Sequence, residues 1–252
     1  MIGSFLFVVI FVIVAPGAHA QLVTDRPDFV ESSTVVGVGV VQLETGGSFT
    51  DVEPGLEVWT TPTLVRVGLS SRLELRAESM LLSHKSVSGG EGKTGVSDIA
   101  LGAKVHLQDA SGGRPSSGLL LHMALPTGSA VYRGKGARPS LRVTAEWELP
   151  ADFSFSVMPG LAMDHDGEQR FASGILGVVV GWRWTDDLRS FAEVAFPQIA
   201  SDEYGGVLAT FDTGATLLLG PDHQVDMGVS LPLTDGADDI VLALGFSVRV
   251  GA

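Results

Sequence analysis

Charged side chains recur at every second position in several stretches of this sequence, between residues that are apolar. The stretch Leu73-Glu74-Leu75-Arg76-Ala77-Glu78 alternates strictly. Because successive side chains of a β-strand point to opposite faces, its charged residues would share one face. Opposed charges on the wall of a water-filled barrel can select small polar or anionic solutes. The candidates for such a lumen are Arg66, Arg72, Glu74, Arg76, Glu78, Asp98, Lys104, Arg142 and Glu146.

The arginines among these candidates suggest a narrower hypothesis. Arg66, Arg72, Arg76 and Arg142 would form a cationic strip along one wall of the lumen. The alternative is that the charges pair across strands and stabilise the barrel without selecting a solute. The sequence leaves both open.

A charged segment precedes the first expected strand. It contains Asp25, Arg26, Pro27 and Asp28, and its proline has a fixed φ and no backbone N–H. We expect residues 21–33 to form a plug at the periplasmic mouth, with Asp25, Arg26 and Asp28 paired to lumen charges. The alternative is an ordered leader into the first strand.

The residue types that catalysis requires are not found in a recognisable pattern. There is no Gly-x-Ser-x-Gly motif. His106 and His122 are expected to face inward, but no serine is fixed beside them, and two such histidines are more often polar lining than a base or metal ligands. We therefore predict no enzyme, no catalytic residue, no metal site and no cofactor. The remaining alternative is a structural or adhesive barrel that acts through acidic surface loops such as 164–168 and 235–239.

The elements that would position the lumen charges are twelve short strands. They are expected at about 34–50, 57–69, 72–82, 95–108, 117–125, 139–149, 152–163, 171–184, 188–199, 206–219, 224–232 and 239–250. Short and longer connections alternate, and many inner faces carry Gly, Ser, Thr and Ala. Both features favour a transmembrane antiparallel up-and-down β-barrel over residues 34–252, rather than a soluble β-sandwich. An even strand number places both ends of the barrel on the periplasmic side.

Composition and the first residues indicate export to a membrane. The chain of 252 residues is 45% hydrophobic, has a net charge of −13 and contains no cysteine, which excludes disulfides and a lipoprotein anchor and makes nucleic acid an unsuitable partner. Residues 1–20 resemble a signal peptide, with an apolar core and the sequence Ala18-His19-Ala20 before a cleavage point. The expected partners in the outer membrane are lipid, lipopolysaccharide, the barrel insertion machinery and a small-molecule solute.

Two motifs resemble a known family. Val23-Thr24-Asp25-Arg26-Pro27-Asp28-Phe29 and Gln42-Leu43-Glu44-Thr45-Gly46 are similar to the opening of the outer-membrane transporter-like family labelled "putative MetA-pathway of phenol degradation". The motif match covers about residues 22–47, and the rest agrees in strand pattern, loop rhythm and length. The resemblance implies a Gram-negative outer-membrane barrel that moves small solutes, including aromatic compounds. One departure is the C-terminus, which lacks the terminal aromatic residue that the insertion machinery reads, although Phe246 lies close by.

Overall fold

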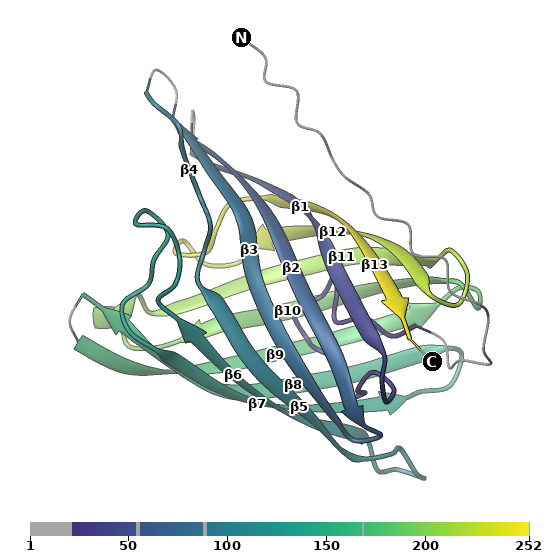
Figure 1. The fold of residues 1–252 in the computed structure, drawn as a ribbon. Coiled ribbons are helices and arrows are strands. Elements are labelled where there is room, and N and C mark those ends of the chain that lie inside the picture. Colours follow the sequence, from purple (N-terminus) through teal and green to yellow (C-terminus); the bar gives the residue numbers. More distant parts are fainter. Residues whose placement is uncertain (1–21, 54–55, 88–89, 168, 252) are drawn as a thin grey trace.

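Twelve strands form a closed antiparallel barrel in the computed structural model, which describes residues 22–53, 56–87, 90–167 and 169–251 (Figure 1). The strands are β1 (Val41–Glu53), β2 (Leu56–Ser70), β3 (Leu73–Val87), β5 (Ile99–Gln108), β6 (Ser116–Leu125), β7 (Arg138–Glu148), β8 (Phe153–Asp166), β9 (Gln169–Arg183), β10 (Leu188–Ile199), β11 (Val207–Leu218), β12 (His223–Pro232) and β13 (Val241–Val250). Each pairs with its neighbour along the chain, and β1 pairs with β13, so the barrel has no free edge. The predicted up-and-down topology is confirmed.

Two small elements lie outside this wall. The strand β4 (Lys93–Gly95) pairs only with the end of β3 and projects at the rim of the barrel (Figure 1). The 3₁₀ turn η1 (Asp202–Tyr204) lies in the connection from β10 to β11. Within the described residues, no helix is long and apolar enough to cross a membrane.

The connections at one end are mostly tight. Residues 71–72, 149–152, 184–187 and 219–222 join strands there, together with the longer 109–115. We call this the short-turn end. The opposite, long-loop end carries residues 126–137, 200–206 and 233–240. Two of its connections are shorter than expected, because β1–β2 and β8–β9 continue as paired strands through most of the predicted loops 51–56 and 164–170.

Burial along the strands is inverted relative to a soluble protein. Leu75, Leu101 and Leu244 are 47%, 50% and 67% exposed, whereas Glu74 and Lys104 are 0% exposed. Apolar side chains on the outer surface are stable in contact with lipid, and buried charges require partners inside the barrel. The alternation of β3 and β5 therefore has the predicted faces, and the arrangement does not fit a β-sandwich.

Aromatic side chains gather at strand ends. At the short-turn end, Phe153 stacks on Trp182, whose ring centroid is 3.8 Å from that of Trp184. At the long-loop end, Phe49 and Trp59 are in contact, with centroids 4.6 Å apart. Such rings favour the boundary between lipid and water.

The first strand begins later than the sequence indicates. Alternating valine and glycine predicted a strand from residue 34, but β1 starts at Val41. Before it the chain turns, with Gly39 at φ +73° and a hydrogen bond from the Val40 N–H to the Gly37 carbonyl. This turn packs on Gly68, where a Cβ atom would lie 1.9 Å from the Gly37 carbonyl oxygen. Valine–glycine alternation suits a strand, but this close approach to β2 fixes a turn.

Candidate functional site

Residues 22–40, called here the inner segment, cross the interior of the barrel. The segment has no regular secondary structure, and its side chains and backbone bond to eight strands, β1, β2, β3, β5, β6, β7, β10 and β12. Contacts with strands all around the ring are compatible only with a position in the lumen. The short turn of residues 37–40 then connects the segment to β1 at the short-turn end.

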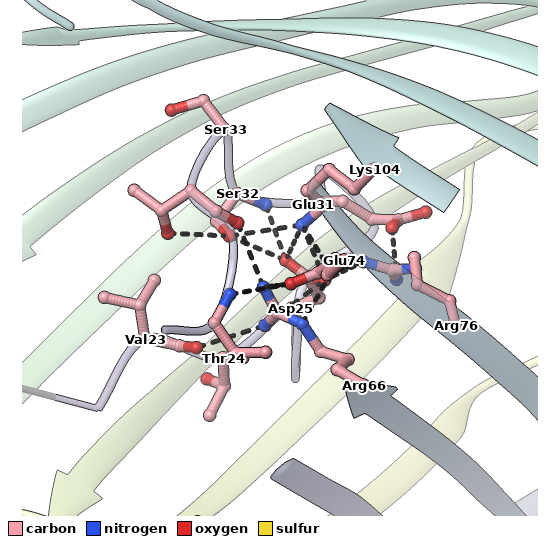
Figure 2. A network of polar contacts seen from close by, with 12 residues as sticks. Val23, Thr24, Asp25, Glu31, Ser32, Ser33, Arg66, Glu74, Arg76 and Lys104 are labelled. Carbon is pink, nitrogen blue, oxygen red and sulfur yellow. Dashed lines mark hydrogen bonds and ion pairs between the residues drawn. The ribbon is translucent and has the colours of Figure 1, made fainter. Parts of the chain in front are cut away.

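A buried network of charges fixes this segment to one side of the wall (Figure 2). Arg66 on β2 bonds to Glu44 on β1 at 3.0 Å and to Glu74 on β3 at 2.9 Å. Arg76 on β3 bonds to Asp25 at 2.6 Å. We call the following set the central ion network: Asp25, Glu31, Glu44, Arg66, Glu74, Arg76, Lys104 and Arg142. Its four carboxylates balance its four cations, so the interior keeps no net charge there.

Asp25 is the centre of the network. Its carboxylate lies 2.6 Å from Arg76, 2.8 Å from Lys104 and 3.5 Å from Arg66. Its other oxygen accepts hydrogen bonds from the backbone N–H and the hydroxyl of Ser32, which closes the chain into a loop. Burial alone would raise the pKa of Asp25, but the charges of Arg66, Lys104 and Arg76 outweigh it and hold the pKa well below its usual range. Asp25 is therefore an anion.

Wall glutamates satisfy the backbone of the inner segment. Glu44 accepts the Asp25 N–H at 2.9 Å, and Glu74 accepts the Val36 N–H at 2.8 Å. Two further glutamates do the same: Glu193 accepts the N–H groups of Phe29 and Val30 at 2.7 and 2.8 Å, and Glu146 accepts the Ser33 N–H at 2.8 Å. A buried N–H without a partner costs free energy, and a segment outside any sheet has no strand to supply one. These carboxylates supply the acceptors that a neighbouring strand would otherwise provide.

Packing and a further ion pair hold the opposite side of the segment. Arg26 lies 3.2 Å from Asp226 on β12. Val30 forms a small apolar cluster with Met158 on β8 and Val179 on β9. A Cβ atom at Gly177 would lie 2.5 Å from the Val30 side chain, so the glycine leaves room for this contact.

Two cavities lie on either side of the inner segment. The cavity toward the short-turn end has a volume of about 170 Å³ and is lined by polar groups such as Ser154, Arg189 and Gln224. The cavity on the other side has a volume of about 540 Å³, and its wall includes Leu64, Met80 and charged residues. The lumen thus contains water-accessible space, and the segment narrows it.

Most predicted lumen residues do face inward. Five of them, Arg66, Glu74, Arg76, Lys104 and Arg142, are in the central ion network, and Glu146 binds Ser33. Glu78 lines the larger cavity and lies 3.5 Å from His122. Asp98 also lines it, and accepts hydrogen bonds from the N–H groups of Gly128 and Gly134, which shape the 126–137 loop.

The four arginines predicted to line one wall do not form a cationic strip. Arg72 is exposed in the turn between β2 and β3, because β3 begins only at Leu73. Arg66 and Arg76 are enclosed by carboxylates, and Arg142 bonds to Glu31 at 2.6 Å. Arg72 is therefore corrected to a turn position. Arg66 pairs across strands, as in the alternative, whereas Arg76 and Arg142 pair with residues of the inner segment.

The predicted plug residues are all on the inner segment. Asp25 and Arg26 pair with wall charges as expected, whereas Asp28 has no ion pair among the described residues. Sequence reasoning missed Glu31, and assigned no role to the inward-facing Glu193. One signal was available: the N–H groups of a segment outside any sheet need acceptors, and inward-facing carboxylates can supply them. The predicted signal peptide, residues 1–20, lies outside the described residues.

A closed barrel whose charged lumen contains a folded segment defines the class: a β-barrel of the outer-membrane type. The chain belongs to the family described as "Putative MetA-pathway of phenol degradation", whose model matches residues 24–250. The fold is similar to the COG4313 outer membrane channel from Pseudomonas putida F1, at 16% identity and a TM-score of 0.62 over 86% of this chain and 98% of that one.

Two porins share the same fold. The NanC porin matches at 11% identity and a TM-score of 0.58, over 82% of this chain and 100% of that one. The KdgM porin matches at 12% identity and a TM-score of 0.54, over 82% and 98%. No curated protein matches the chain in sequence.

Proposed function

We propose that this protein is an outer-membrane channel for small solutes, in which the inner segment acts as a plug that narrows the pathway. The observation that carries the proposal is a closed barrel with a cavity on each side of a segment fixed across its lumen. The family membership and the channel fold of the similar structures support it.

In this proposal the short-turn end faces the periplasm and the long-loop end faces the medium. Short periplasmic turns and longer external loops are the usual arrangement in such barrels. The signal peptide is cleaved after Ala20, and the insertion machinery places the barrel among lipid and lipopolysaccharide. The aromatic residues at the two strand ends, such as Trp182 and Trp59, then lie at the two interfaces.

The larger cavity suits solutes that combine an apolar body with a polar group. Leu64, Met80 and the ring of Phe29 line it beside Glu78 and Arg142. Sites of mixed character of this kind bind small amphipathic molecules. Together with the family description, this lining supports small aromatic compounds such as phenols as the solute class.

Conductance of refolded residues 21–252 in a planar bilayer tests the channel. Discrete steps are expected, and deletion of residues 21–32 should increase the step size, because it removes most of the segment from the lumen. A matched control is Asp152→Asn, which removes an exposed ion pair with Arg183 in a turn at the short-turn end and should leave the step size unchanged. Folded protein without conductance, before and after the deletion, would refute the proposal. Uptake of phenol into vesicles compared with that of glucose tests the solute class separately.

A further inference from the structure

The two cavities share part of their lining. Arg26 and Asp28, both on the inner segment, border the smaller and the larger cavity. These two residues therefore lie where the two cavities adjoin. We call this place the neck.

The inner segment is anchored too firmly to leave the lumen at each passage. Its removal would take Asp25 and Glu31 from Arg66, Arg76 and Lys104, of which Arg66 and Lys104 are 0% exposed. Buried charges that lose one partner are strongly destabilised. A route beside the segment avoids this step.

The two charged side chains at the neck differ in their partners. The guanidinium of Arg26 is paired with Asp226 at 3.2 Å. Asp28 has no cationic partner in the part of the chain that the structure describes, and the charged groups that act on it are the carboxylates of Glu193, Asp25 and Glu146.

We propose that solutes pass a stationary inner segment through the neck, and that the Asp28 carboxylate gives this neck a preference for cations and for the cationic forms of small solutes. This inference rests on the proposed channel function and adds a specificity-determining residue to it. Fixed negative charge at a constriction concentrates cations and repels anions. It also reverses the anion preference that a cationic strip would have produced.

The test is the reversal potential of the full mature chain in a KCl gradient. Burial and the Glu193 charge raise the pKa of Asp28, so the recordings use an alkaline buffer that favours the ionised carboxylate. We expect a potassium-to-chloride permeability ratio of about 3 or more. Asp28→Asn should lower it by a factor of about 2, whereas Asp28→Glu should keep it. Asp187→Asn, in an exposed turn, is the matched control and should have no effect.

A disulfide tests whether the segment stays in place. The Ser33 and Ser116 hydroxyl oxygens are 2.7 Å apart, and the chain has no cysteine, so Ser33→Cys with Ser116→Cys provides one defined pair that can join the segment to β6. Oxidation should leave the conductance and the permeability ratio unchanged, and a channel that closes on oxidation overturns the stationary segment. Conductance with the same ratio in Asp28→Asn overturns the role of Asp28 alone. No conductance from folded protein overturns the channel function and this inference together.

Discussion

Replacement of Asp25 by asparagine should release the inner segment from the wall. The substitution keeps the shape of the side chain and the acceptor for Ser32, but it removes the negative charge that lies 2.6 Å from Arg76 and 2.8 Å from Lys104. Lys104 then retains the carboxylate of Glu74 at 4.0 Å and the hydroxyl of Ser32 at 3.4 Å. The central ion network changes from four carboxylates and four cations to an excess of one buried positive charge.

The magnitude follows from the burial of the partners. Asp25 is 6% exposed, Arg76 4% and Lys104 0%, so solvent screens these pairs little. Loss of one partner of such a pair costs about 3 to 5 kcal/mol. If the barrel itself remains folded, the substitution destabilises the docked state of the segment by this free energy. The ratio of docked to undocked molecules then drops by a factor of about 150 to 5,000.

Cysteine labelling measures that ratio directly. Val30 is 4% exposed and packs on Met158 and Val179, so a Val30→Cys protein should react with a maleimide only when the segment undocks. Asp25→Asn should speed the reaction by up to the factor above, and Asp152→Asn, which removes an exposed pair, should change it by less than about fivefold. Equal labelling rates with and without Asp25→Asn, in barrels that remain folded, would refute the reasoning.

Three further predictions concern the same segment. Glu193→Gln should weaken docking by about 1 to 3 kcal/mol, because the Phe29 and Val30 N–H groups lose a charged acceptor. The rate of Val30→Cys labelling measures this loss, and an unchanged rate would show that these two hydrogen bonds are dispensable. Because Asp25 has a lowered pKa, its contribution to docking is complete above the ordinary value of 3.8 and is lost only as the pH falls through the lowered value. The ratio of Val30→Cys labelling rates with and without Asp25→Asn should therefore be the same at about pH 5 as at neutral pH, and should fall only in stronger acid. Gly68→Ala should displace the turn of residues 37–40, since the new Cβ would lie 1.9 Å from the Gly37 carbonyl oxygen, and protease cleavage in this turn should become faster; wild-type resistance to protease would contradict this.

Strand alternation was sufficient to predict the wall. Leu75 and Leu101 face outward and Glu74 and Lys104 inward because a period of two has only two possible registers, and one of them would have placed charges in lipid. The strand starts were less accurate. Arg72 belongs to a two-residue turn whose position depends on pairing between β2 and β3, which no single stretch of sequence specifies.

The contacts of the inner segment were predictable only in part. The charges of Asp25 and Arg26 required partners in a lumen, and this need predicted ion pairs with the wall. Which wall carboxylates would pair with cations and which would accept backbone N–H groups depends on contacts between residues up to 200 positions apart, as for Arg26 and Asp226. Glu146 was therefore recognisable as a lumen residue but not as a backbone acceptor.

The wide separation of these partners also sets an order of assembly. The inner segment precedes every strand in the chain, yet its partners Glu193 and Asp226 are on β10 and β12, near the other end. The partners of Asp25, in contrast, are on the early strands β2, β3 and β5. Contacts between residues close in sequence can form before contacts between distant ones. The segment can therefore bind the early strands through Asp25 first, and can complete its contacts through Arg26, Phe29 and Val30 only after β10 and β12 have joined the wall.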